Sequence, residues 1–174
     1  MFFIQMSGFP GSGKSTLSRQ IAEKIGAVIV DHDIVKTALI TSFEEIPIEK
    51  KLVGKIAYNV DWSLVEFHLS QGLNVVLDSP CLYQEMVDRG IDLSKKYNAT
   101  YKYVECYLND FQEINNRLKS RNKMVSQINA VSSEETFKRT LENSKKPDEG
   151  SYIVVNTSEP LESYIDQVID FIET

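Results

Sequence analysis

One octapeptide near the start of the chain constrains its fold more than any other segment. It reads Gly8-Phe9-Pro10-Gly11-Ser12-Gly13-Lys14-Ser15 and fits the pattern G-x-x-x-x-G-K-[ST]. An apolar run, Phe2–Met6, precedes it, and Lys14–Ile25, with apolar residues at helical spacing, follows it. Glycines let backbone N–H groups turn inward, and the N-terminus of a helix adds partial positive charge. The octapeptide therefore predicts a strand–loop–helix unit that binds phosphate groups.

Each residue of this loop has an expected role toward a nucleoside triphosphate. The backbone of Gly8, Gly11, Ser12 and Gly13 is expected to approach the phosphate oxygens. Lys14 supplies a mobile positive charge to the β- and γ-phosphates, Ser15 offers a hydroxyl to Mg²⁺, and Thr16 donates to the α-phosphate. The alternative is a glycine-rich turn with a surface lysine. The position of the loop between a strand and a helix favours the phosphate site, with ATP and Mg²⁺ as the cofactors.

Apolar, strand-like runs alternate with helical segments along the chain. Strands are predicted at Phe2–Met6, Ala27–Val30, Leu73–Leu77, Tyr101–Leu108 and Tyr152–Val155. Helices are predicted over Lys14–Ile25, Asp31–Ile40, Pro47–Gln71 and Tyr83–Tyr97. Two further helices are predicted to begin at the capping boxes Asp110–Glu113 and Ser132–Glu135, and Ser158 is predicted to cap the last helix. This alternation predicts βαβ units and an α/β fold, and near-continuous apolar strands indicate that helices cover both sheet faces. We expect a single domain over residues 1–174.

The longest predicted helix, Pro47–Gln71, carries an apolar stripe that predicts its buried face. The stripe consists of Leu52, Ile56, Val60, Leu64 and Phe67. A second line, with Tyr58, Trp62 and Glu66, could form an aromatic wall of a ligand pocket, although core packing is the expected role of Trp62.

Charge and cysteine content narrow the class of protein. The chain has 19 Lys+Arg and 25 Asp+Glu, a net charge of −6, and a pI near 5.0, which argues against a dedicated nucleic-acid coat. Residues 115–146 carry +5 and the remainder −11, which favours an anionic partner there, with a solvated helix face as the alternative. No apolar run reaches the roughly 18–20 residues of a membrane span. Two cysteines, Cys81 and Cys106, are too few for a zinc cluster. We expect a reduced cytoplasmic protein, a monomer or homodimer with no membrane partner.

Two segments exclude other nucleotide-binding classes. Asp78-Ser79-Pro80-Cys81 follows the third strand where a switch GTPase has Asp-x-x-Gly, and Asn122-Lys123-Met124-Val125 lacks the aspartate of Asn-Lys-x-Asp. The chain is too short for an ABC-type ATPase. A small P-loop kinase remains.

The chain resembles the small P-loop kinases grouped with the zeta-toxin, chloramphenicol phosphotransferase and polynucleotide 5′-kinase domains, a group also labelled AAA-family ATPases. The resemblance rests on residues 8–16 and on Asp31-His32-Asp33-Ile34-Val35-Lys36. Weaker matches are residues 75–78 and 117–121. Together the matches extend the resemblance over nearly the whole chain. It implies a three-layer P-loop NTPase fold with a five-stranded parallel sheet in the order 2-3-1-4-5 and a mobile helical lid at about residues 117–146.

Carboxylates follow the second and third predicted strands, where strand ends line the ligand crevice of a parallel sheet. In the resembled families the aspartate three residues before a Lys or Arg is the base, which assigns Asp33 as general base and Lys36 as a contact to the acceptor or the phosphate. Asp31 remains an alternative base, or a helix N-cap. His32 is expected to be a surface histidine at that cap, with a pH-sensitive ligand as the alternative. Asp78 is expected to hold Mg²⁺ or to bind the acceptor, with a loop-capping aspartate as the alternative.

Arginines and the end of the last strand complete the predicted site. Arg117 and Arg121 are four residues apart on a predicted helix and share a face, from which they are expected to contact the transferring phosphoryl group. Their alternative roles are solvated arginines or structural ion pairs. The resemblance implies that Asn156 and Thr157 hold the adenine and ribose edge.

The sequence thus predicts an ATP-dependent kinase that phosphorylates a hydroxyl of a small molecule. A polynucleotide 5′-kinase is one alternative, although the acidic remainder makes nucleic acid an unfavourable partner. A non-catalytic, ATP-dependent switch protein is the other.

Overall fold

A computed structural model describes residues 1–43 and 46–174 of the chain. Within these ranges one parallel sheet contains β1 (Phe2–Ser7), β2 (Ala27–Asp31), β3 (Asn74–Asp78), β4 (Thr100–Tyr107) and β5 (Tyr152–Asn156). The order of the strands is β2-β3-β1-β4-β5, and every pair is parallel. The helices are α1 (Lys14–Ile25), α2 (His32–Ser42), α3 (Lys50–Ser70), α4 (Gln84–Tyr97), α5 (Phe111–Ser120), α6 (Glu134–Glu142) and α7 (Ile165–Glu173). The predicted fold class and strand order are confirmed.

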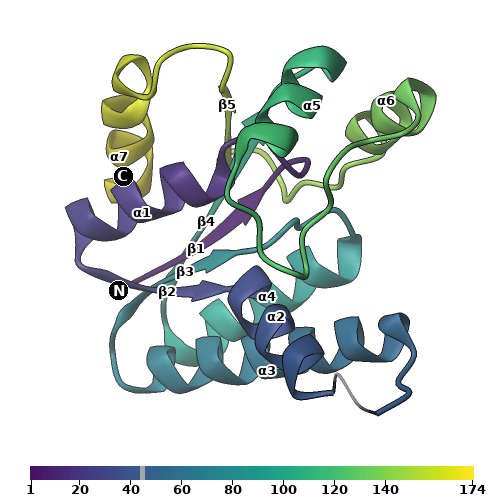
Figure 1. The fold of residues 1–174 in the computed structure, drawn as a ribbon. Helices are drawn as coiled ribbons and strands as arrows, with labels where there is room; N and C mark the ends of the chain where they lie inside the picture. The colour runs from purple at the N-terminus through teal and green to yellow at the C-terminus, as the bar shows by residue number, and fades with distance from the viewer. Residues whose placement is uncertain (44–45) are drawn as a thin grey trace.

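Helices cover both faces of the sheet and form two separate cores (Figure 1). Helices α1 and α7 lie on one face, where Leu17 and Val168 pack against Ile4 of β1. Helices α3 and α4 lie on the other face, where Val65 packs with Phe3 of β1. Neighbouring residues of the central strand thus enter opposite cores, which explains why the strands are apolar without alternation.

The predicted buried face of the long helix is wrong. Leu52, Leu64 and Phe67 of α3 are exposed, Phe67 by 58%. The buried face is displaced by one residue and consists of Val53, Ala57, Asp61, Trp62, Val65 and Leu69. Val53 and Val65 on this face are smaller than their exposed neighbours Leu52 and Leu64, and the ring of Trp62 packs beside Phe3, with ring centroids 6.3 Å apart. The core role expected for Trp62 is confirmed.

A third, smaller core joins the phosphate loop to the region predicted as a lid. Phe9 of the loop packs with Ile114 and Leu118 of α5 and with Phe137 of α6. The rings of Phe9 and Phe137 meet edge to face, with centroids 4.9 Å apart. Figure 1 shows α5 and α6 beside each other at one end of the sheet. The mobility of residues 117–146 stays a prediction.

The predicted helix caps are confirmed at two of three positions. Asp110 accepts hydrogen bonds from the backbone N–H groups of Gln112 and Glu113, and Ser133 accepts one from Thr136. Ser158 is not the cap of the last helix, because a 3₁₀ turn at Leu161–Ser163 intervenes before α7.

Two further properties follow from the same part of the structure. Cys81 and Cys106 are both free thiols in buried positions. Among the described residues no helix combines the length and the apolar character needed to cross a membrane.

A buried amide fixes the contact between α4 and the sheet, and it yields a stability prediction. The Gln5 side chain donates to Cys81 Sγ (2.9 Å) and to the Met86 carbonyl (3.1 Å), and accepts from the Tyr101 hydroxyl (2.8 Å). A Cβ at Gly90 of α4 would overlap the amide oxygen of Gln5. Gly90→Ala should therefore lower the free energy of unfolding by about 2 kcal/mol, as overpacking does.

The matched control is Gly54→Ala in α3, where a Cβ meets nothing within 4 Å. It should raise the free energy of unfolding by about 0.5–1 kcal/mol, because alanine is the better helix former. Urea denaturation of both variants measures the two effects. Equal effects of the two substitutions would contradict the packing of α4 on Gln5.

Candidate functional site

The loop between β1 and α1 has a backbone that favours glycine. Gly8, Gly11 and Gly13 have φ values of 130°, 87° and 91°. A Cβ on Gly8 would overlap the carbonyl oxygen of Cys106. Gly13 is the N-cap of α1, and no described side chain caps this helix end with a hydrogen bond. The first N–H groups of α1 are therefore available to an anion, as a phosphate-binding loop requires.

Lys14 is buried against this loop. Its exposed fraction is 9%, and Nζ donates to the carbonyl oxygens of Gly8 (2.8 Å) and Phe9 (3.0 Å). Burial lowers the pKa of Lys14, and the nearby carboxylate of Asp78 opposes this shift. Ser12 Oγ is also buried and has no partner among the described residues. A bound polyphosphate would stabilise the charge of Lys14, so the loop fits the triphosphate of a nucleotide.

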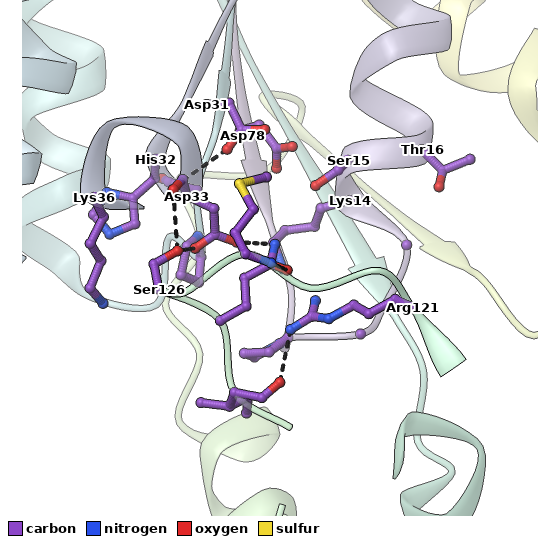
Figure 2. Close-up of a pocket in the computed structure, with 18 of the residues that line it drawn as sticks. Lys14, Ser15, Thr16, Asp31, His32, Asp33, Lys36, Asp78, Arg121 and Ser126 are labelled. Atoms are coloured by element: carbon purple, nitrogen blue, oxygen red, sulfur yellow. Dashed lines mark hydrogen bonds between the residues drawn. The ribbon is translucent and has the colours of Figure 1, made fainter. Parts of the chain in front are cut away.

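A cavity of about 690 Å³ opens beside the loop. Figure 2 shows that its walls combine the loop, the ends of β2 and β3, the first turn of α2 and the segment after α5. The predicted site residues that line it are Gly11, Gly13, Lys14, Ser15, Thr16, Asp31, Asp33, Lys36, Asp78, Arg117 and Arg121. Arg19 of α1 also lines it, although its position outside the loop pattern gave no signal in the sequence. The structure thus brings most of the predicted residues to one cavity.

Ser15 and Asp78 fit a magnesium ion that arrives with a nucleotide. Both line the cavity, and Asp78 is nearly buried, with Oδ2 accepting from Ser18 Oγ at 3.2 Å. No group of three or more His, Cys, Asp or Glu side chains that could hold a metal occurs among the described residues. Mg²⁺ usually takes one or two protein oxygens and completes its shell with phosphate and water. Ser15 and Asp78 provide such a pair.

Asp31 and Asp33 have different partners at the start of α2. Asp31 Oδ1 accepts from the backbone N–H groups of Asp33 (2.8 Å) and Ile34 (3.3 Å), so Asp31 is the N-cap of this helix. Asp33 accepts from Gln127 Nε2 at 2.7 Å and from Ser126 Oγ at 3.2 Å. The sequence did not indicate Ser126 and Gln127, because they lie in an irregular segment without a motif. Asp33 lines the cavity and, unlike Asp31, caps no helix.

The prediction that His32 lies on the surface is wrong. Its exposed fraction is 4%, and Nδ1 lies 2.6 Å from Oδ2 of the fully buried Asp61. Its ring stacks on Tyr58 with centroids 4.0 Å apart. Both rings line the cavity. The sequence carried one signal of this contact, the presence of Asp61 within the largely apolar helix α3.

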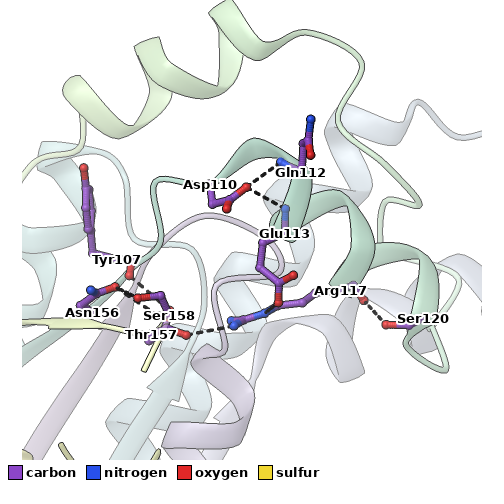
Figure 3. A network of polar contacts seen from close by, with 9 residues as sticks. All are labelled: Tyr107, Asp110, Gln112, Glu113, Arg117, Ser120, Asn156, Thr157 and Ser158. Atoms are coloured by element: carbon purple, nitrogen blue, oxygen red, sulfur yellow. Dashed lines mark hydrogen bonds and ion pairs between the residues drawn. The ribbon is translucent and has the colours of Figure 1, made fainter. Parts of the chain in front are cut away.

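Arg117 is held in place by two partners (Figure 3). Its Nε donates to Glu113 Oε1 at 2.7 Å, and its NH2 group donates to the carbonyl oxygen of Thr157 at 3.0 Å. Arg121 does not share a helical face with it, because α5 ends at Ser120 and Arg121 has extended backbone angles. Arg121 instead donates to the Ile128 carbonyl at 3.0 Å, and burial lowers its pKa while Asp33 opposes this shift. Both arginines still line the cavity.

Asn156 and Thr157 lie beside the cavity rather than in its wall. Asn156 Oδ1 accepts from the backbone N–H and the hydroxyl of Ser158, which forms a tight turn. Thr157 is nearly buried, and its Cβ lies 3.9 Å from where a Cβ of Gly13 would be. Their role toward a base or ribose stays a prediction.

Comparison with known proteins gives a family and a fold. The model of a family described as an AAA domain matches residues 3–147. No curated protein sequence matches the chain. Among solved structures, a sugar kinase from Janibacter sp. HTCC2649 has a TM-score of 0.69 at 15% identity, covering 99% of this chain and 95% of that chain. A gluconokinase from Sinorhizobium meliloti 1021 has a TM-score of 0.65 at 18% identity, with coverages of 99% and 91%.

Kti12 from Chaetomium thermophilum, in complex with ADP-AlF3, has a TM-score of 0.66 at 12% identity, and the match covers 98% of each chain. At these identities the comparisons show a shared fold, that of the P-loop kinases.

The crowding of carboxylates at the ends of β2 and β3 yields a prediction about acidity. Asp31 lies opposite Asp78 in the strand register, and its pKa is raised above 3.8 by burial and by that neighbouring carboxylate. In the folded protein, Asp31 therefore keeps its proton to higher pH than in the unfolded chain, and its contribution to stability falls as pH rises through this interval. A carboxyl ¹³C NMR titration in EDTA should show the raised value.

Asp78→Asn removes the neighbouring charge and should lower the pKa of Asp31 in the same titration. Glu135→Gln, on the exposed start of α6, serves as the control and should leave it unchanged. A pKa of Asp31 that does not respond to Asp78→Asn would contradict the electrostatic coupling of the two strand ends.

Proposed function

We propose that this chain, which belongs to the AAA domain family, transfers the γ-phosphate of ATP to a hydroxyl group of a small molecule. One observation carries the proposal: the phosphate loop with Lys14 and the carboxylate of Asp33 line the same cavity. A loop that holds a triphosphate and a base that faces its end are the two parts that phosphoryl transfer requires.

The chain's own residues account for each part of this reaction. The backbone of the phosphate loop and Lys14 hold the triphosphate, while Asp33 accepts the proton of the attacking hydroxyl. The hydroxyl oxygen bonds to the γ-phosphorus as the bond to the bridging oxygen of ADP breaks, so ADP is the leaving group. Arg117 and Arg121 add positive charge near the transferred group. A magnesium ion held by Ser15 and Asp78 would neutralise negative charge on the phosphates.

The net charge of the chain favours a small-molecule acceptor over a polynucleotide. The cavity wall itself carries both signs, because Asp31, Asp33 and Asp78 line it together with the cations Lys14, Arg19, Lys36, Arg117 and Arg121. A nucleic-acid strand brings a phosphate for every nucleotide, and the chain outside residues 115–146, with a charge of −11, would repel it.

Nucleotide binding can be tested at Lys14. Lys14→Ala should weaken Mg²⁺-ATP binding by about 10- to 100-fold, the expected loss of a charge-assisted hydrogen bond. Lys119→Ala, on the exposed side of α5, is the control and should bind ATP as the unmodified protein does. Isothermal titration calorimetry measures both. Equal affinities for the two variants would remove the basis of the proposed function.

The base can be tested separately. Asp33→Asn keeps an oxygen for Gln127 but cannot accept a proton, so it should lower phosphoryl transfer by about 100-fold or more and leave ATP affinity unchanged. The assay follows ³²P from γ-labelled ATP into a panel of hydroxylated sugars, polyols and antibiotics. A variant that is fully active would show that Asp33 is not the base.

A further inference from the structure

A buried hydrogen-bonded pair lies behind the acceptor side of the cavity. Asp61 on α3 is fully buried, and its Oδ2 lies 2.6 Å from Nδ1 of His32 at the first position of α2. A carboxylate only accepts hydrogen bonds, so Nδ1 carries the proton and donates it to this contact. Nε2 is then the ring nitrogen left for a ligand, and His32 is part of the cavity wall.

The geometry fixes the histidine ring from two directions. Asp61 holds one edge of the ring, and Tyr58, one turn earlier on α3, stacks on its face at an interplanar angle of 19°. These two contacts hold the ring in one orientation. A ligand that binds Nε2 therefore does not have to order the side chain first, which is the property of a preorganised binding group.

A purely structural role explains this pair poorly. The second carboxylate oxygen of Asp61, Oδ1, is buried and has no hydrogen-bond partner among the described residues. A buried charge with an unsatisfied oxygen is costly, and apolar residues of similar volume often stabilise a core equally well. The pair is therefore better explained by what it does for the cavity than by what it adds to stability.

The groups around His32 indicate the class of molecule. Asp31, His32 and Asp33 are consecutive residues, and all three line the cavity. The cation of α2 in this wall, Lys36, lies three residues after Asp33. The two carboxylates and Nε2 of His32 can accept hydrogen bonds from hydroxyl groups, whereas a carboxylate or phosphate placed against Asp31 and Asp33 would face like charge. Together they suit a molecule with several hydroxyl groups and no negative charge.

We propose that His32, held by Asp61 and Tyr58, binds a hydroxyl group of an uncharged polyol or sugar, next to the hydroxyl that Asp33 deprotonates. This inference rests on the proposed function, because it assigns the acceptor of the same reaction. It makes His32 a substrate-binding residue and Asp61 a positioning residue that acts through it.

The chain offers an internal control for a direct test, because it has two histidines, His32 and His68. Histidine side-chain ¹⁵N NMR of the whole protein, with Mg²⁺ and a non-hydrolysable ATP analogue, is recorded with glycerol, ribitol or glucose. Glycerol 3-phosphate and gluconate are the charged counterparts. Nε2 of His32 should shift with at least one uncharged probe, and the signals of His68 should stay in place.

The outcomes separate this inference from the proposed function. A shift of His32 only with the charged probes, or with none, overturns the inference. Calorimetry on the same samples shows whether the ATP analogue binds. If it binds and ³²P transfer reaches only charged acceptors, the kinase function stands and the acceptor class is wrong. If no nucleotide binds, both fall.

Two substitutions at His32 distinguish contact from structure. His32→Asn keeps a donor near the position of Nδ1 for Asp61 but lacks Nε2, so it should fold, bind ATP normally and raise the KM of the uncharged acceptor about tenfold. His32→Gln keeps a polar group near Nε2 and should recover part of this loss. An unchanged KM in His32→Asn overturns the inference. Should that variant not fold, the NMR experiment on the unmodified protein decides.

Discussion

The site depends on how the chain leaves β1 next to β4. At Gly8 a Cβ would overlap the carbonyl oxygen of Cys106, so the loop can begin at this point only because the residue is glycine. The same turn sends Phe9 into the core of α5 and α6 and brings Lys14 back onto the carbonyl oxygens of Gly8 and Phe9. One backbone constraint thus shapes the phosphate loop and attaches the neighbouring helices to it.

Sheet topology then decides which charges meet at the loop. Strand β1 lies between β3 and β4, and β2 follows β3, so parallel pairing brings the ends of β2 and β3 to the edge where the loop begins. Asp31 and Asp78 are opposite each other in the register. Burial and the neighbouring charge of Asp78 raise the pKa of Asp31, and a cation at this edge would offset the repulsion between the two carboxylates. The topology of the sheet therefore brings two carboxylates to the edge where the phosphate loop begins.

Local signals made the fold and the phosphate loop predictable. Each strand, the helix after the loop and the caps at Asp110 and Ser133 depend on neighbouring residues, and the structure has them where the sequence indicated. The face of α3 depends on tertiary packing. Two lines of residues with similar spacing compete, and the line with Leu52, Leu64 and Phe67 is exposed, whereas the line with Val53, Trp62 and Val65 is buried. Because the wrong face of α3 was predicted to be buried, Asp61 was not identified as a buried residue from the sequence.

The acceptor side combines segments that no sequence pattern connects. His32 meets Asp61 across 29 residues, and Asp33 meets Gln127 across 94 residues, so neither contact has a local signature. The helix end near Arg121 shows the same limit, because the helix stops one residue before it and the arginine reaches the cavity from extended backbone.

This separation has a consequence for specificity. The phosphate loop itself is one continuous segment, whereas the cavity wall around Asp33 and His32 combines α2, α3 and the segment after α5. Substitutions in those three elements can change the acceptor without disturbing the phosphate loop. A fold of this kind can therefore keep one phosphoryl donor while its acceptors diverge, and the acceptor has to be inferred from the residues around Asp33 rather than from the fold.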